Sequence, residues 1–191
     1  MLGIVFCGGK STRMGTDKGL ISILDENWAT LAFGKLSAVN IPVKVSVNGS
    51  QNENYLQFFT KEQLIIDDLS LGLAGPVLAL LSVHAKYPQD DLLVLACDLP
   101  LMEESLLLQL LEAERNAPQY EALIFSHAGN IEPLCAIYKA KGLAKVMLEL
   151  RSGRLTWHSM KHVLSLLQVF QLEIPEHKAM AFKNFNTHNQ L

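Results

Sequence analysis

Glycines and cations gather near the start of this 191-residue chain, directly after a short apolar run at residues 2–6. They are Gly8, Gly9, Lys10, Arg13 and Lys18. Glycine has no Cβ, so a loop of this kind can bring its backbone N–H groups close to an anion. Fixed positive charge beside such donors suits a polyphosphate. The stretch therefore predicts a phosphate-binding loop that follows a buried strand.

Two better-known nucleotide loops do not fit these residues. A P-loop requires a glycine five residues before Gly9, where the chain has Ile4. The dinucleotide-binding pattern G-x-G-x-x-G is absent, because Gly8 and Gly9 are adjacent and the next glycine is Gly15. A glycine turn between a strand and a helix, with solvated basic residues, is the remaining non-functional alternative.

A second candidate for chemistry is Asp98, which follows the apolar run at residues 92–97. A carboxylate at the end of a buried strand needs a partner. Mg²⁺ commonly takes one or two carboxylates together with water and phosphate oxygens, so Asp98 is a candidate magnesium ligand. The alternative is an N-cap for a helix that opens near Glu103.

Residues 6–18 fit the pattern [LF]-x-G-G-x-S-x-R-M-G-x-D-K. This pattern resembles the signature of nucleotidyltransferases that make sugar-nucleotides and cofactor-nucleotides. The similarity is greatest to the molybdenum cofactor guanylyltransferases, which usually have alanine where this chain has Cys7. The other stretches that match are residues 45–48, Asp68 with Gly75-Pro76, and residues 97–100, 132–138 and 184–187.

The resemblance implies transfer of GMP from GTP to the terminal phosphate of molybdopterin, with release of pyrophosphate and with Mg²⁺ as cofactor. It also implies a set of site residues. Arg13 and Lys18 would be catalytic; Phe6, Cys7, Gly8, Gly9, Lys18, Asn48, Asp68 and Asp98 would bind the nucleotide; and Asp98 would hold the metal. Relatives that use CTP tend to have alanine at the position of Gly8, so glycine there implies room for the guanine 2-amino group. Other proteins of cofactor biosynthesis are implied as partners.

Several alternatives stay open at this point. The acceptor could be another phosphorylated molecule that receives a guanylyl or cytidylyl group, or the chain could bind GTP without catalysis. Arg151, Arg154 and Lys161 could contact the acceptor's phosphate or could be solvated. A metal contact from Asn184 or Asn186 is also open, because the family pattern is lost after Thr187.

Apolar runs alternate with helical patterns along the chain, which predicts an α/β fold with a doubly wound, mostly parallel sheet and helices on both faces. The resemblance implies the nucleotide-diphospho-sugar transferase-like form of this fold. Expected strands are residues 2–6, 43–47, 64–66, 92–97, 122–125 and 132–138. Expected helices are residues 28–39, 54–61, 76–85, 103–115, 139–150 and 155–162, while periodicity leaves residues 163–173 undecided between helix and strand.

Ligands of such sheets bind beyond the carboxyl ends of the strands. Gly8-Gly9, Asn48, Asp68 and Asp98 each follow an expected strand, so we expect them to meet at one edge. The chain should form a single domain, 1–191. Its N-terminal part, about residues 1–100, would bind GTP, and its second part, about residues 101–191, would bind the acceptor.

Composition limits the remaining function classes. A formal net charge of −3 gives no basic excess for nucleic-acid binding. The three cysteines have no C-x-x-C spacing, so we expect three buried thiols in a reducing compartment rather than a zinc site. The first apolar run lacks a basic leader and ends at Gly8, and no apolar run is long enough to cross a bilayer. We therefore expect a cytoplasmic protein without membrane contact.

Overall fold

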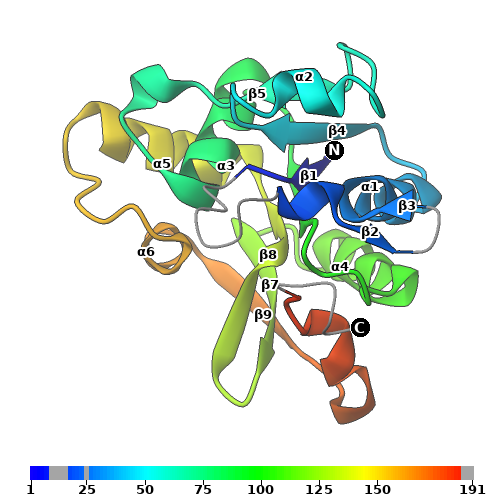
Figure 1. The fold of residues 1–191 in the computed structure, drawn as a ribbon. Helices are drawn as coiled ribbons and strands as arrows, with labels where there is room; N and C mark the ends of the chain where they lie inside the picture. Colours follow the sequence, from blue (N-terminus) through cyan, green and yellow to red (C-terminus); the bar gives the residue numbers. More distant parts are fainter. Residues whose placement is uncertain (9–16, 24–25, 186–191) are drawn as a thin grey trace.

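A computed structural model describes residues 1–8, 17–23 and 26–185. In this part of the chain a seven-stranded sheet has the order β5-β4-β1-β6-β8-β7-β9, and all its strands are parallel except β8 (Figure 1). The strands are β1 (Leu2–Phe6), β4 (Val43–Val47), β5 (Leu64–Ile66), β6 (Leu92–Ala96), β7 (Ala122–His127), β8 (Asn130–Tyr138) and β9 (Val169–Glu173).

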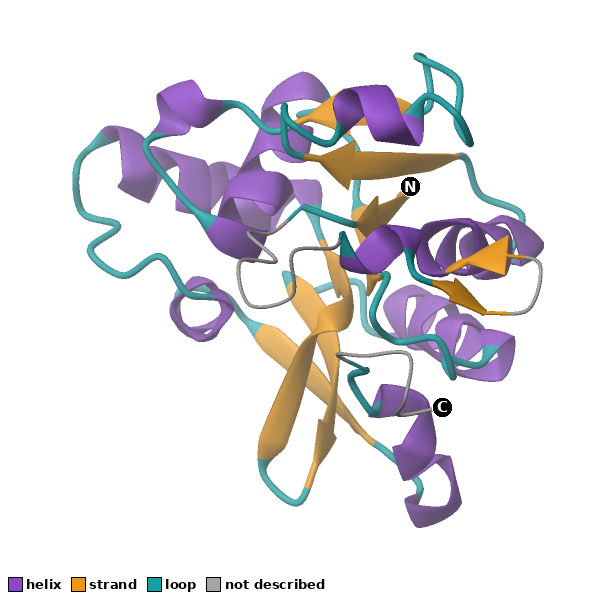
Figure 2. Cartoon of the chain, in the orientation of Figure 1, coloured by secondary structure: helices purple, strands orange, loops and turns teal. Residues whose placement is uncertain are grey.

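Helices cover both faces of the sheet (Figure 2). One face is covered by α1 (Trp28–Ala38) and α4 (Glu104–Asn116), and the other by α3 (Gly75–Lys86), α5 (Ala140–Arg151) and α6 (Met160–Ser165). Successive side chains of a strand point to opposite faces. Accordingly, Val5 packs in the core beneath α1 and α4, whereas Ile4 and Phe6 pack beneath α3. The predicted doubly wound, mostly parallel α/β fold is confirmed.

Local differences from the expected elements have visible causes. Residues 22–27 form a small antiparallel pair, β2 (Ser22–Ile23) and β3 (Glu26–Asn27), and the Asn27 side chain caps α1. Helix α2 spans Asn52–Tyr55, so it begins two residues earlier than the expected helix at residues 54–61 and ends six residues sooner. Helix α6 starts later than expected, because the Ser159 side chain accepts a hydrogen bond from the backbone N–H of His162 and so begins the helix there. The undecided segment then divides between the end of α6 and strand β9.

Short 3₁₀ helices complete the described chain: η1 (Lys18–Leu20), η2 (Leu69–Leu71) and η3 (Glu176–Phe182). As expected, all three cysteines are free and buried. None of the helices in the described part of the chain is long and apolar enough to cross a membrane.

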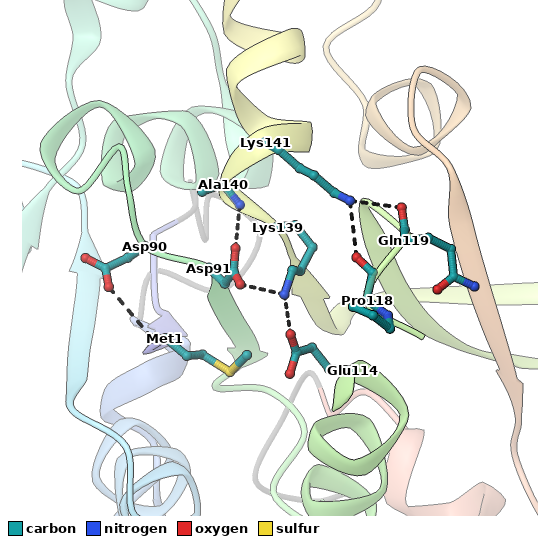
Figure 3. Close-up of polar contacts among 9 residues, drawn as sticks. All are labelled: Met1, Asp90, Asp91, Glu114, Pro118, Gln119, Lys139, Ala140 and Lys141. Carbon is teal, nitrogen blue, oxygen red and sulfur yellow. Dashed lines mark hydrogen bonds and ion pairs between the residues drawn. The ribbon is translucent and has the colours of Figure 1, made fainter. Parts of the chain in front are cut away.

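Ion pairs join the amino ends of β1 and β6 to each other and join the start of β6 to Lys139, which directly precedes α5 (Figure 3). The Met1 ammonium lies 3.8 Å from Asp90, and Lys139 Nζ lies 2.6 Å from Asp91 Oδ2 and also contacts Glu114. Asp91 Oδ1 accepts a hydrogen bond of 2.7 Å from the N–H of Ala140, the first residue of α5. These contacts lie at the end of the strands opposite to the edge where Gly8 and Asp98 follow them.

Candidate active site

The carboxyl ends of the four neighbouring strands β5, β4, β1 and β6 form one edge of the sheet. Backbone hydrogen bonds continue the strand pairing past the last strand residues: Cys7 N donates to Ser46 O, Asp67 N to Val47 O, and Cys97 N to Phe6 O. A candidate residue follows each strand at this edge. In the order β5, β4, β1 and β6, these residues are Asp67, Asn48, Gly8 and Asp98. The predicted gathering is confirmed for Gly8, Asn48 and Asp98, whereas Asp67 was not among the residues expected at this edge.

Lys18 and Asp98 lie side by side at this edge although 80 residues separate them. Lys18 Nζ is 3.6 Å from Asp98 Oδ2, with the side chains 30% and 22% exposed. Asp98 Oδ1 is buried and accepts no hydrogen bond from the described residues. Burial raises the pKa of Asp98, and Lys18 only partly opposes this effect. Asp98 is therefore a desolvated carboxylate with one oxygen left for a further cation.

This carboxylate is suited to Mg²⁺. Its alternative role as an N-cap is wrong, because α4 begins at Glu104 and its cap is Glu103. Within the described ranges, no three His, Cys, Asp or Glu side chains are grouped so as to hold a metal. A single carboxylate is compatible with Mg²⁺, because this ion commonly keeps water and phosphate oxygens as its other ligands.

Two adjacent aspartates follow β5, and the structure separates their roles. Asp67 is buried, and its Oδ1 accepts a hydrogen bond of 2.8 Å from Ser46 Oγ. The predicted nucleotide ligand Asp68 is exposed instead, and its Oδ1 accepts hydrogen bonds from the backbone N–H and the hydroxyl of Ser70. The carboxylate that faces the strand-end loops is therefore that of Asp67, which sequence reasoning did not select.

Gly8 makes room for this carboxylate. A Cβ on Gly8 would lie 2.9 Å from Asp67 Oδ2 and 3.7 Å from the backbone nitrogen of Asn48. The Asn48 Oδ1 atom is already an acceptor for the N–H groups of Ser50 and Gln51 and for the Ser50 hydroxyl. The Asn48 side chain can thus serve a ligand chiefly through its amide donors.

The other predicted site residues divide into three groups. Phe6 and Cys7 are buried, with the Phe6 side chain in the core. Arg154 forms an ion pair with Glu149 at 2.8 Å on the surface. Gly9, Arg13, Lys10 and Asn186 lie outside the described residues.

Sequence reasoning also left Asp17, Gln51 and Tyr55 without a role. In the structure they form a hydrogen-bonded group beside Lys18. The one available signal was the acid directly before Lys18 in the matched pattern. Gln51 and Tyr55 come from the turn and helix after Asn48, where nothing in the local sequence indicated contact with the first loop.

The sheet order and the polar edge place the chain in the class of nucleotide-diphospho-sugar transferase-like α/β folds. Residues 3–168 match the family model described as the MobA-like NTP transferase domain. The match spans most of the chain, so the chain belongs to this family of nucleotidyltransferase enzymes.

Individual relatives agree with this assignment. A molybdenum cofactor guanylyltransferase of Campylobacter jejuni subsp. doylei is 32% identical over 136 residues, which are 71% of this chain and 66% of that protein. The aligned stretch is thus slightly less than two thirds of that relative. A probable molybdenum cofactor guanylyltransferase of a Geobacillus species is 26% identical over 100% of this chain and 95% of its own length.

Solved structures show the same fold. Molybdopterin-guanine dinucleotide biosynthesis protein A from Archaeoglobus fulgidus superposes with a TM-score of 0.77 at 19% identity, covering 99% of this chain and 94% of its own. The bifunctional IspDF protein from Campylobacter jejuni superposes with a TM-score of 0.72 at 15% identity, covering 99% and 52%. At these identities the likeness is one of fold.

Proposed function

We propose that this chain transfers GMP from GTP to the terminal phosphate of molybdopterin and releases pyrophosphate. The family, and relatives named molybdenum cofactor guanylyltransferase, support this activity. The observation that carries the proposal is the approach of Lys18 Nζ to Asp98 Oδ2 at the carboxyl edge of the sheet, with Asp98 Oδ1 unpartnered among the described residues. The Lys18 ammonium can bind phosphate oxygens and the Asp98 carboxylate can hold a metal ion, so the pair suits a triphosphate.

The reaction requires little covalent chemistry from the protein. An oxygen of the acceptor phosphate forms a bond to the α-phosphorus of GTP, and the bond from that phosphorus to the bridging oxygen of the β-phosphate breaks. The acceptor phosphate has a second pKa of about 6, so near neutral pH it is already a nucleophile and needs no general base. The protein's task is to align the two phosphates and to offset negative charge on the departing pyrophosphate.

Lys18, and Arg13 of the same sequence motif, would supply positive charge at the leaving group. Asp98 would hold Mg²⁺, which when bound neutralises phosphate charge and draws the triphosphate into one geometry. The Oδ1 atom of Asp98, which accepts no hydrogen bond from the described residues, supports this role.

The opposite end of the site would receive the base. In the strand order, Asp67 lies three strands away from Asp98, beside Asn48 and Gly8. Guanine presents adjacent N–H donors at N1 and N2, which a carboxylate can accept. We therefore add Asp67 to Asp68 as a candidate ligand of the base. The candidate nucleotide ligands all fall within about residues 1–100, so we propose that this part binds GTP and that about residues 101–191 bind the acceptor.

The test is pyrophosphate release with each of the four ribonucleoside triphosphates and a panel of acceptors: molybdopterin, a sugar phosphate and another phosphorylated cofactor precursor. The highest kcat/KM is expected for GTP with molybdopterin in the presence of Mg²⁺. A preference for CTP or for another acceptor would replace the proposal with transfer to that partner. Tight GTP binding without turnover would indicate a non-catalytic binding module.

A further inference from the structure

One buried amide joins three segments of the active-site edge. Gln51, which directly precedes α2, is 7% exposed. Its Nε2 donates to the carbonyl of Cys7 at 3.0 Å and to Asp17 Oδ2 at 2.6 Å, and its Oε1 accepts from the backbone N–H of Asn48 at 2.9 Å. Both N–H donors and the carbonyl oxygen of this side chain are thus in use.

Asp17 is the residue through which Gln51 reaches Lys18. Asp17 caps η1, whose first residue is Lys18, and its Oδ1 accepts from the N–H of Gly19 at 3.0 Å. The same oxygen accepts from the Tyr55 hydroxyl at 3.1 Å. With Gln51 on the other oxygen, the carboxylate has three donors. Asp17 is therefore occupied in holding the turn that presents Lys18 and is not an open metal ligand.

Close packing fixes this turn against α2. A Cβ on Gly19 would lie only 2.1 Å from the Tyr55 hydroxyl oxygen, so η1 and Tyr55 approach as closely as a glycine allows. Burial, with nearby thiols and Asp17 adding to it, raises the pKa of Tyr55, so its hydroxyl stays protonated and can donate to Asp17. A side chain at position 19 would therefore displace either η1 or Tyr55.

We propose that Gln51 is a positioning residue for the transfer reaction, an inference that rests on the proposed function. Gln51 acts through Asp17 to hold the Lys18 ammonium opposite Asp98. Its other two hydrogen bonds fix the positions of the Cys7 carbonyl and the Asn48 backbone N–H. Without its two donors, the Asp17 carboxylate and the cap of η1 shift. A displacement of about 1 Å at a catalytic group can lower a rate about a hundredfold.

A double-mutant cycle tests this role. Gln51→Glu keeps the size of the side chain but removes both donors and sets a negative charge against Asp17. We expect it to lower kcat about ten- to a hundredfold while the KM for GTP changes less, because Lys18 acts mainly on charge that develops at the leaving group. In a Lys18→Met background the same substitution should lower kcat less than about twofold further, since residues that act as one unit are not additive.

Gln63→Glu is the matched control. Gln63 also binds a nearby backbone group, the N–H of Thr60 at 2.8 Å, through an oxygen that glutamate retains, and it lies at the start of β5, away from this edge. Its kcat should equal that of the wild type. If Gln51→Glu lowers kcat by the same factor with and without Lys18, or if its loss tracks a fall in the melting temperature, the positioning role is wrong.

The inference and the proposed function fail in different ways. If the wild type transfers no GMP, the proposed function is wrong. If the wild type transfers GMP but the effects of Gln51→Glu and Lys18→Met on kcat are additive, the proposed function stands and the positioning role alone is wrong.

Discussion

Asp67 Oδ2 lies 2.9 Å from the point where a Cβ on Gly8 would stand. The Ser46 hydroxyl holds the other oxygen of this carboxylate, so the group cannot move aside freely. An alanine at this position must therefore displace either the buried carboxylate or the glycine loop. The proposed binding site for the base therefore depends on glycine at position 8.

Gly8→Ala should consequently lower kcat/KM for GTP by about tenfold or more and reduce the preference for GTP over CTP. The reason is the displaced Asp67 carboxylate, together with the loss of space beside the base. Pyrophosphate release with both nucleotides measures the effect. Gly34→Ala is the control, since no atom lies within 4 Å of its Cβ position in α1. There alanine should leave activity unchanged and stabilise the helix by about 0.5–1 kcal/mol.

Asp67→Asn should stabilise the fold at neutral pH. Burial raises the pKa of Asp67 to about 6, although the Ser46 hydrogen bond opposes this. The folded state thus holds this proton more tightly than the unfolded chain, where the pKa is about 3.9. The stability that the proton confers is complete below about pH 4 and is lost as the pH rises through about 6. Asparagine imitates the neutral form and avoids this loss.

The gain over the wild type should therefore be close to zero near pH 4 and reach about 3 kcal/mol above pH 7. Denaturant unfolding across this range measures it. The control is Asp68→Asn. Hydrogen bonds from Ser70 lower the pKa of the exposed Asp68, so its substitution should give no gain as the pH rises. If the difference in the free energy of unfolding between Asp67→Asn and the wild type does not change with pH, the pKa of Asp67 is not raised in the folded state. The affinities of the two variants for GTP also show which aspartate contacts the nucleotide.

Lys139→Met should destabilise the fold without changing catalysis. Burial alone would lower the pKa of Lys139, but contacts with Asp91 and Glu114 outweigh it and raise the pKa, so the lysine stays charged (Figure 3). Removing it leaves two acids, 26% and 19% exposed, without their cation. We expect a loss of about 3 kcal/mol in the free energy of unfolding, with kcat retained under folding conditions.

The control for this prediction is Lys141→Met. The exposed Lys141 donates to the carbonyls of Pro118 and Gln119 at 3.2 and 2.9 Å, as Figure 3 shows, and leaves no buried charge when replaced. Its loss should stay within about 0.5 kcal/mol. Equal effects of the two substitutions in chemical denaturation would show that the half-buried ion pairs of Lys139 do not stabilise this end of the sheet.

The sequence predicts which edge of the sheet forms the site, because the positions of the strand ends follow from local patterns. Apolar runs such as residues 92–96 end one or two residues before a polar side chain, and parallel strands bring those ends together. Asp98 was found in this way. The choice between Asp67 and Asp68 could not be made, because a one-residue shift at a strand end turns a side chain to the other face.

The hydrogen-bonded group around Asp17 could not be predicted for a different reason. Gln51 is separated by 34 residues from Asp17 and by 44 from Cys7, so no local pattern links them. Their contact follows from how the turn after β4 packs on the end of β1. Strand β9 was undecided for a similar reason, because its pairing with β7, not its own periodicity, makes it a strand.

In the proposed function, Lys18 and Asp98 together bind a triphosphate with its Mg²⁺. The most direct test is the rate of pyrophosphate release from GTP with molybdopterin and Mg²⁺ in Asp98→Ala, compared with Asp90→Ala. Asp90 pairs with the chain terminus at the opposite end of the sheet. We expect Asp98→Ala to lower kcat/KM at least about a hundredfold and Asp90→Ala to keep the wild-type rate. Equal product formation by Asp98→Ala and the wild type would contradict this proposal.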